Sequence, residues 1–529
     1  MKKAVLFCSF SLSIWGIYAQ IESGGVPYSF VNQSITDKTP TEQLSLPILG
    51  LHSDNEAILS KEDGYKFGDE IAVDFGLTNS GIWEMLPSGD RLWRLHFRSE
   101  GAKSLNLLFD DFYIPPHSKM FIYTADKSFV KGAFTAKNNN QWNNFATAFF
   151  PNDELIIEYQ EDKSDIGQGR IHLNGVVHSY EDFFKKGTYG KASGNCHINI
   201  NCTGYEEYQN VKNAVALILF RSSAYCTGTL INNTAQNAKP YFLTANHCTS
   251  GRNLSQFVFV FNYESEDCEG NDETTFYSIN GAKLLASDPR SDFALLLLND
   301  TIAYENKPYY AGWSRENVPP LLPVGIHHPH GDLKKIAVAY PANHSQYDAT
   351  ISIGTHWAVL WERGTTESGS SGSALFNENF LVVGQLEGGY ASCAENDTDF
   401  YGKIYYSWTN DNSPDSNRLD YWLDPLGTGA LQCSGYDPCK CSILPNNPLK
   451  ESLTLAPNPA KDYVGVFSEN ELITSISIYS LAGQRILYKK GEQERIFLNV
   501  NSLADGAYFV EVELKTGKIA HKLLFVKNR

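Results

Sequence analysis

Short runs of alternating apolar and polar residues fill the chain from about Tyr65 to Gln160. Gly, Pro and Asn separate the runs, and three clear examples are Leu92–Phe97, Met120–Tyr123 and Leu155–Tyr159. Successive side chains of a β-strand point to opposite faces, so a period of two between turn residues predicts strands. We therefore expect an all-β domain here, which on the pattern alone is a β-sandwich of unknown role.

Two further stretches show the same kind of pattern. From about residue 192 to 435, short apolar runs again alternate with turns, as expected of two packed β-barrels. The stretch from 453 to 529 contains strand-like runs such as Ser475–Tyr479 and Lys522–Val526. It has roughly the smallest size that folds unaided. The expected fold class is all-β, with a double β-barrel between a β-rich domain and a small C-terminal β-sandwich.

The chain of 529 residues is too long for a single core, and its segments suggest boundaries. Residues 1–19 have the charged start and short apolar run of a secretory signal peptide; an uncleaved membrane anchor is the alternative. Residues 20–191 form the β-rich domain, which ends in a small, polar, easily cleaved segment. Residues 192–435 form the barrels, and residues 436–452 form a linker rich in chain breakers before the final domain, residues 453–529.

The net charge of the chain argues against some classes of binding partner. The formal net charge is −17 and the isoelectric point is near 5.2. Nucleic acids and anionic membranes require a basic face on a partner, so the charge argues against both. The same charge is ordinary for a well-solvated secreted protein, and it does not bear on the fold.

The cysteines are confined to one part of the chain. Cys8 lies in the signal segment, and the others lie between Cys196 and Cys441. In an oxidising compartment such cysteines form disulfides, and none has the Cys-x-x-Cys spacing of a zinc site. Cys226 and Cys248 are natural partners, and their bridge would contribute about 3 kcal/mol by restricting the unfolded chain. One odd set has no assigned pairing: Cys433, Cys439 and Cys441.

Three motifs follow one another in the order His, Asp, Ser: Thr244–Cys248, Ser291–Leu295 and Gly369–Ser373. A serine hydroxyl is a weak nucleophile that a neutral imidazole activates, while a carboxylate holds the imidazole in the right tautomer. Alone, a His before a Cys is more often structural, and a Gly/Ser run is more often a linker. In this order the three motifs are typical of a chymotrypsin-type serine protease. The candidate catalytic residues are His247, Asp292 and Ser371.

The loop that carries Ser371 lies between the strand-like runs Trp357–Trp361 and Ala374–Phe376, which argues against a linker. Its glycines let the N–H groups of Gly369 and Ser371 point together at a developing oxyanion, each worth about 3 kcal/mol in the transition state. Trypsin-like enzymes have an Asp before the nucleophile, which binds the new N-terminal ammonium after zymogen cleavage. Ser370 stands there in this chain, so we expect activation by removal of an inhibitory domain.

Over about residues 192–430 the chain resembles the bacterial lysyl endopeptidases, a branch of the trypsin-like superfamily. Besides the motif flanks, the resemblance rests on Ser193–Cys196, Ile326–Pro329, Thr366–Ser373 and Gly384–Gly389 with Ser392–Cys393. It implies a chymotrypsin-like double β-barrel, and residues 81–159 are similar to the family's propeptide. The disulfides that it implies are Cys196 with Cys393, Cys202 with Cys268, and Cys226 with Cys248.

The resemblance also implies a specificity pocket with an aspartate at its base, which by motif is Asp399. A buried carboxylate requires a cationic partner, so a substrate lysine satisfies it and a neutral side chain does not. The alternative is that Asp399 and Asp397 are solvated loop acids. The family has His where this chain has Glu387, next to Gly388 in the segment that lines the substrate cleft. A carboxylate there would favour basic residues further along the peptide.

The last stretch, from about residue 453 to 529, resembles the C-terminal sorting domain of the type IX secretion system of Bacteroidota. Pro457–Ala460, Leu481–Arg485 and Gly506–Tyr508 carry this resemblance. It implies passage through the periplasm of a Gram-negative bacterium and then release or attachment at the cell surface. The secretion machinery is therefore an expected partner.

The expected function is that of a secreted serine endopeptidase that cleaves after lysine through an acyl-enzyme and needs no cofactor. Its expected partners are protein and peptide substrates and its own propeptide, acting as an intramolecular inhibitor. One rival is a trypsin-like enzyme that accepts Lys and Arg alike, and another is a protease-like surface binding protein without turnover. Lysines at both predicted junctions suggest that the enzyme trims itself: Lys185, Lys186, Lys191, Lys440 and Lys450.

Three histidines close together do not form a predicted metal site. No acidic or Cys ligand of suitable spacing accompanies His327, His328 and His330. The family resemblance assigns the His-His-Pro segment to the structure of the domain, so no metal is predicted.

Overall fold

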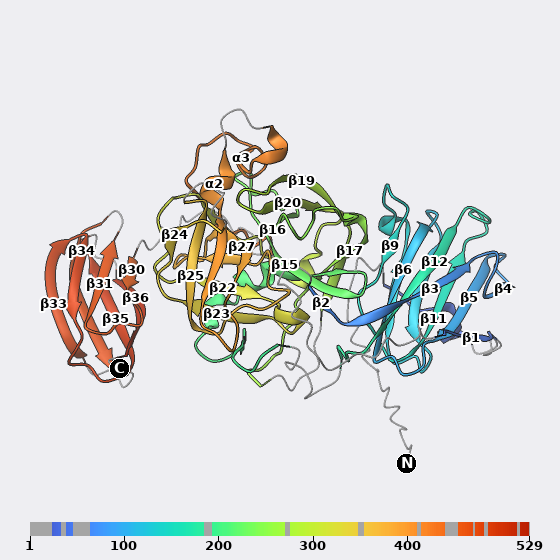
Figure 1. The fold of residues 1–529 in the computed structure, drawn as a ribbon, viewed down its shortest axis with the longest axis horizontal. Helices are drawn as coiled ribbons and strands as arrows, with labels where there is room; N and C mark the ends of the chain where they lie inside the picture. The colour runs from blue at the N-terminus through green and yellow to red at the C-terminus, as the bar shows by residue number, and fades with distance from the viewer. Residues whose placement is uncertain are drawn as a thin grey trace, which may run out of the picture. The chain divides into compact units, whose positions relative to one another are not determined.

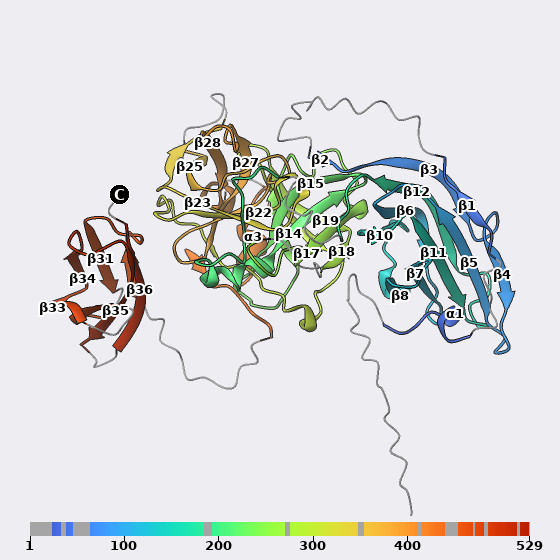
Figure 2. The ribbon, with the colours of Figure 1, turned by 90° about the horizontal axis from the view of Figure 1, so that it is seen from below.

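The computed structural model describes the chain in segments, drawn as ribbons in Figures 1 and 2. The described residues are 24–32, 39–45, 64–184, 193–269, 276–347, 354–409, 414–439, 453–468, 471–480, 485–515 and 519–527. The chain forms two compact units, with the boundary in the sequence between Cys439 and Lys440. The predicted signal peptide, Cys441, the junction lysines and residues 481–484 of the sorting motif lie outside the described residues.

Two facing sheets make up the N-terminal part of the first unit (Figure 1). One has the order β1-β5-β11-β7-β8 with β4 on β5, and the other has the order β10-β6-β12-β3 with β9 on β6. Side chains such as Trp93, Phe109 and Tyr159 are buried between them, because inward positions alternate with polar outward ones. The predicted sandwich is therefore present.

The elements of this part have the following bounds: α1 Tyr28–Val31, β1 Thr41–Gln43, β3 Gly68–Gly76, β4 Ile82–Met85, β5 Arg91–Arg98, β6 Ser104–Tyr113, β7 Lys119–Thr124, β8 Val130–Phe134, η2 Ala136–Asn138, β9 Phe145–Ala146, β10 Phe150–Pro151, β11 Glu154–Glu161 and β12 Arg170–Ser179.

Two β-barrels follow. The first sheet has the order β18-β17-β14-β15-β16-β20-β19 and remains open as a half-barrel, to which the separate strand β2 adds at β15. The second closes, because β23 pairs with β25 as well as with β22, so that β22, β23, β25, β26, β27 and β28 form a ring. The expected chymotrypsin-like all-β fold is confirmed, with one closed six-stranded barrel and one half-barrel.

The strands of the half-barrel are β2 Tyr65–Lys66, β14 Val215–Phe220, β15 Ser223–Leu230, β16 Tyr241–Ala245, β17 Phe257–Phe261, β18 Tyr277–Asn280, β19 Ala282–Asp288 and β20 Phe293–Leu298. The ring consists of β22 Val324–His327, β23 Lys335–Ala339, β25 His356–Arg363, β26 Ala374–Phe376, β27 Val382–Gly389 and β28 Thr398–Lys403. Short strands at its margins are β13 Ile198–Asn199, β21 Trp313–Ser314, β24 Asn343–Ser345 and β29 Gln432–Cys433.

Helices are few and short in the described part of the barrels. The α-helices α2 Ile404–Trp408 and α3 Asp420–Leu423 come after β28. The 3-10 helices are η3 Glu206–Tyr208, η4 Val211–Ala214, η5 Leu254–Gln256, η6 Tyr304–Asn306, η7 Pro329–Gly331 and η8 Asp415–Asn417. Among the described residues, the longest and most apolar helices fall short of what crossing a bilayer requires.

The second unit is a small sandwich of its own. A three-stranded sheet has the order β30-β31-β34, and a four-stranded sheet has the order β33-β32-β35-β36. Val464, Ile476 and Val510 are fully buried between them. The strands are β30 Leu453–Ala456, β31 Tyr463–Ser468, β32 Ile473–Ser480, β33 Arg485–Gln493, β34 Arg495–Asn499, β35 Gly506–Leu514 and β36 Ile519–Val526.

A buried ion cluster joins the half-barrel to the ring. The Lys334 ammonium is fully buried and lies 3.0 Å from one Glu264 oxygen, while the Lys212 ammonium lies 2.5 Å from the other. Burial acts to raise the pKa of Glu264, but the two lysines prevail and lower it to about 2. The carboxylate therefore neutralises a charge that has no access to water.

Replacing Glu264 should destabilise the barrels in a pH-dependent way. Glu264→Gln leaves Lys334 buried without its counter-charge, and such a loss costs about 3–5 kcal/mol. Because the folded pKa lies below the ordinary value of 4.5, the contribution is full above pH 4.5 and is lost as the pH falls toward 2. Calorimetry should show a lower melting temperature at pH 7 and a smaller difference from wild type at pH 3.

The matched control is Glu266→Gln, two residues along the chain at an exposed position. It should leave the melting temperature unchanged at both pH values. An equal effect of the two substitutions would show that the cluster does not carry this stability.

Candidate active site

Strand register brings His247 and Asp292 together. β16 and β20 are antiparallel neighbours, with Ala245 opposite Phe293. His247 follows the end of β16 by two residues, and Asp292 directly precedes β20, so the ladder places both at the same end of the pair. The Asn246 N–H continues the ladder by donating to the Asp292 carbonyl at 2.7 Å.

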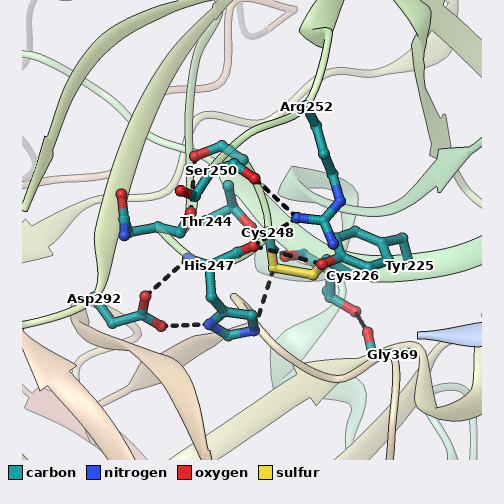
Figure 3. The surroundings of a disulfide bond; sticks show 12 residues. Tyr225, Cys226, Thr244, His247, Cys248, Ser250, Arg252, Asp292 and Gly369 are labelled. Atoms are coloured by element: carbon teal, nitrogen blue, oxygen red, sulfur yellow. Dashed lines mark hydrogen bonds and ion pairs between the residues drawn. A yellow bond between two sulfur atoms is a disulfide. The ribbon is translucent and has the colours of Figure 1, made fainter. Parts of the chain in front are cut away.

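The Asp292 carboxylate forms hydrogen bonds with His247 at two points (Figure 3). One oxygen accepts the backbone N–H of His247 at 2.9 Å, and the other lies 2.7 Å from the ring Nδ1. Since an ionised carboxylate only accepts, Nδ1 carries the proton and Nε2 is left as a proton acceptor. Asp292 is buried and has a φ of +51°, a strained conformation of the kind found at functional sites.

Ser371 lies in the loop between β25 and β26, and β15 holds that loop. The Thr227 N–H donates to the Ser371 carbonyl at 2.8 Å, and the Thr227 hydroxyl donates to the Gly369 carbonyl at 2.9 Å. The same hydroxyl accepts the His328 N–H at 3.1 Å. Ser371 is 1% exposed, so its loop is part of the core, as its flanks predicted.

A disulfide and one close backbone approach connect this loop to His247. Cys226, next to Thr227, is bonded to Cys248, next to His247 (Figure 3). Gly372 has a φ of +81°, and a Cβ there would lie 2.1 Å from the Thr244 hydroxyl, three residues before His247. Only glycine fits at that position. The Ser371 backbone therefore lies against the strand ends that carry the His–Asp pair.

The backbone of His247 has further support. The Tyr225 hydroxyl donates to its carbonyl at 3.4 Å, and an Arg252 guanidinium nitrogen donates to the same carbonyl at 3.1 Å. The Arg252 guanidinium also lies over the Tyr225 ring, 4.1 Å from its centroid (Figure 3). Sequence reasoning missed both residues, because their roles depend on contacts across a loop rather than on a motif.

Ser370 occupies the position at which trypsin-like enzymes have an aspartate. Its hydroxyl lies 2.7 Å from Nδ1 of the buried His327 and accepts the Glu367 N–H at 3.2 Å. The Glu367 carboxylate in turn accepts from Gly194 N–H and lies 3.0 Å from Nε2 of His197. A network of histidine, serine and glutamate side chains thus holds the loop where the trypsin-like enzymes use an ammonium–carboxylate pair.

Asp399 is fully buried on β28, which rules out the alternative of a solvated loop acid. One of its oxygens accepts from the Trp361 indole at 2.7 Å and from the Thr366 hydroxyl at 2.5 Å. These donors are neutral, so they orient the carboxylate without cancelling its charge. Asp397, two residues earlier, is exposed.

Glu387 and Gly388 lie on β27, beside the Ser371 loop. The Gly372 N–H donates to the Leu386 carbonyl at 2.8 Å, which places Glu387 next to that contact. The Glu387 carboxylate forms an ion pair of 2.5 Å with Nε2 of His356, a fully buried side chain on β25. Burial raises the pKa of Glu387, and Asp292 adds to the effect. His356 was not predicted, because nothing in its local sequence marks it.

Potential metal ligands cluster twice within the described segments. The groups are Cys196, His197 and Cys393, and Cys226, His247 and Cys248. The cysteines in both are disulfide-bonded, so neither group offers a thiolate. His327, His328 and His330 point to separate partners: the Ser370 hydroxyl, the Asp332 carbonyl and the Glu367 carboxylate.

Three disulfides are present, and they join Cys196 to Cys393, Cys202 to Cys268, and Cys226 to Cys248. These are the pairs that the family resemblance implied. Cys433 is buried as a thiol, and Cys439 is exposed. Burial raises the pKa of Cys433 to about 11, so this thiol is unreactive at neutral pH.

Two segments of the chain match models of known protein families. Residues 190–402 match the family model described as the lysyl endopeptidase C-terminal domain. The barrels resemble a lysyl endopeptidase. Residues 454–527 match the secretion system C-terminal sorting domain, which supports secretion or a cell-surface location.

A lysyl endopeptidase of Pseudomonas aeruginosa is 30% identical over 292 residues, which cover 52% of this chain and 58% of that protein. The chain thus spans a little over half the length of this curated relative. A crystal structure of an inactive mutant of Rv3671c from M. tuberculosis H37Rv is 16% identical with a TM-score of 0.26, over 38% of this chain and 85% of that one.

Removing two of the disulfides in turn separates an effect on stability from an effect on the geometry of the site. Replacing Cys226 and Cys248 with alanine opens a short loop and should cost about 3 kcal/mol, whereas replacing Cys196 and Cys393 opens a long one and should cost about 5 kcal/mol. The first pair connects the residue after His247 to the residue before Thr227, whose N–H holds the Ser371 carbonyl. In assays below both melting temperatures, the first variant should nevertheless lose more activity. Activity losses that follow the stability losses would contradict this role.

Proposed function

We propose that the chain is a secreted serine endopeptidase that hydrolyses peptide bonds on the carboxyl side of lysine. The observation that carries the proposal is the pair of hydrogen bonds between Asp292 and His247, together with the Ser371 backbone, which Thr227 holds by a hydrogen bond. The match to lysyl endopeptidases over the same residues supports it.

In this mechanism the Ser371 hydroxyl attacks the substrate carbonyl while Nε2 of His247 takes its proton. Asp292 stabilises the imidazolium that forms, and the N–H groups of Gly369 and Ser371 bind the oxyanion. His247 then protonates the leaving amine, which leaves an acyl-enzyme on Ser371. Water, deprotonated by His247, hydrolyses the ester and restores the enzyme. Each step uses only side chains, backbone N–H groups and water, so no cofactor is invoked.

Asp399 is proposed to select lysine. Its carboxylate is fully buried and is oriented by the neutral donors Trp361 and Thr366. A substrate ammonium that reaches it forms a charge-assisted hydrogen bond, which no neutral side chain can replace. Glu387 and Gly388 are proposed to contact the substrate from β27, where the Glu387 charge favours basic residues.

We assign the chain order to a secreted preproenzyme. Residues 1–19 act as the signal peptide, residues 20–191 as a propeptide that inhibits the enzyme, and residues 192–435 as the protease. After the linker 436–452, residues 453–529 direct the chain from the periplasm across the outer membrane. The match of the last segment to a sorting domain supports the final step.

A protease-like binding protein is the alternative from another class. The ordered His247–Asp292 pair weighs against it, because a binding surface has no need of a fixed imidazole tautomer.

The test is Ser371→Ala with fluorophosphonate labelling of the wild type. The wild type should be labelled and trimmed at its junctions, while the variant should be unlabelled and stay full length, since it lacks the nucleophile. Mass spectrometry measures both. Failure of processed wild type to react would favour the binding protein, and identical trimming of the variant would assign the processing to another protease.

Asp399→Asn tests lysine selection. It removes the charge but keeps a side chain of similar shape, so kcat/KM for lysine peptides should fall by about a hundredfold or more. Matched Lys, Arg and Gln peptides measure the effect, and the labelling rate of Ser371 should stay near that of wild type. Retained lysine selectivity would show that another acid forms the pocket, while equal cleavage after Lys and Arg by the wild type would favour a general trypsin-like enzyme.

A further inference from the structure

The strand β2 lies between the sandwich strands β1 and β3 in sequence but pairs with β15 of the half-barrel (Figure 2). Tyr65 lies opposite Ala224 and Lys66 lies opposite Ser223 in an antiparallel register. The Phe67 N–H then donates to the Ser222 carbonyl at 3.0 Å, before the chain returns to the sandwich at β3. We call residues Gly64–Phe67 the strap.

Side-chain contacts reinforce this pairing. The Tyr65 ring stacks on His330 of η7 with 5.4 Å between centroids and an angle of 27°. Its hydroxyl donates to Glu181 of the N-terminal domain at 3.0 Å. Gly64 lies so close to Tyr225 that a Cβ there would be 2.8 Å from the Tyr225 Cα. The strap is therefore held by both the barrel and the sandwich.

The part of β15 that the strap covers lies beside the nucleophile. On this edge, β16 pairs only with Thr229 and Leu230, and the strap pairs with Ser223 and Ala224. Ala224 is three residues before Thr227, whose N–H holds the Ser371 carbonyl. An uncovered strand edge of this kind is a template for an extended peptide.

The two sides of the Ser371 loop differ. On one side, β27 contacts the loop through Leu386 and pairs at Gly389 with Asp399. A substrate lysine that reaches Asp399 therefore places the residues before the scissile bond on the β27 side. The residues after the scissile bond then extend away from β27, toward the side where Thr227 of β15 holds the Ser371 loop, and the strap covers the start of that strand.

We propose that the strap is the inhibitory element of the N-terminal domain. It occupies the β15 edge that would bind the substrate residues following the scissile bond. This inference rests on the proposed function. It replaces a general inhibitory role for residues 20–191 with competition for one strand edge.

The test uses chains in which Lys185, Lys186 and Lys191 are replaced by Gln, so that the junction stays intact. Gly64→Ala places a Cβ against Tyr225 and should dislodge the strap. Gly101→Ala is the matched control, because Gly101 has a similar φ of +84° but no atom within 4 Å of the added Cβ. Tyr65→Ala, which removes only the stacking and the hydroxyl contact, is a second variant.

Two substrates distinguish an effect on the β15 edge from an effect on the nucleophile. One is a peptide with four residues after its lysine, and the other is a blocked lysine methyl ester, which has none. Gly64→Ala and Tyr65→Ala should raise kcat/KM for the peptide at least tenfold and change that for the ester less than twofold. Gly101→Ala should change neither. No gain on the peptide, or equal gains on both substrates, would overturn the inference.

If the proposed function is wrong, the assays give a different result from the one that overturns the strap. The chain with native junction lysines would then hydrolyse neither substrate after processing. In that case, the rate of backbone amide hydrogen exchange at Ser222–Tyr225, measured in the same junction-intact chains, shows whether the strap pairs with β15. Faster exchange in Gly64→Ala than in Gly101→Ala supports it, and equal exchange overturns it.

Discussion

The two hydrogen bonds between the Asp292 carboxylate and His247 are the interaction on which the candidate site depends. One bond fixes the backbone and the other fixes the ring, so a single buried side chain determines both the position and the tautomer of the imidazole. This is possible because the β16–β20 register brings the two strand ends together. The proposed general base is therefore prepared by the half-barrel before any substrate binds.

Strand β15 links this pair to the rest of the site. Through Thr227 it holds the loop of Ser371, and through Cys226 it is bonded to the residue after His247. The strap pairs with the start of the same strand. Positioning of the proposed nucleophile and the proposed inhibition thus depend on neighbouring residues of one strand.

The site departs from the trypsin-like pattern at Ser370 and from the lysyl endopeptidase pattern at Glu387. At the first, hydrogen bonds with His327 and Glu367 replace a charged pair, so the loop is ordered without a new N-terminal ammonium. At the second, burial and the nearby Asp292 raise the pKa of the Glu387 carboxylate, and the buried His356 is its ion-pair partner.

The fold class and the catalytic candidates were predictable from sequence, because strand periodicity is local and the three motifs carry their chemistry in short segments. The His356–Glu387 pair, the Glu264–Lys334 cluster and the strap on β15 were not. Each joins residues from different strands that carry no mark in their own neighbourhood. Their proximity depends on which strands pair and in which register, and burial then decides how strongly their charges act on one another.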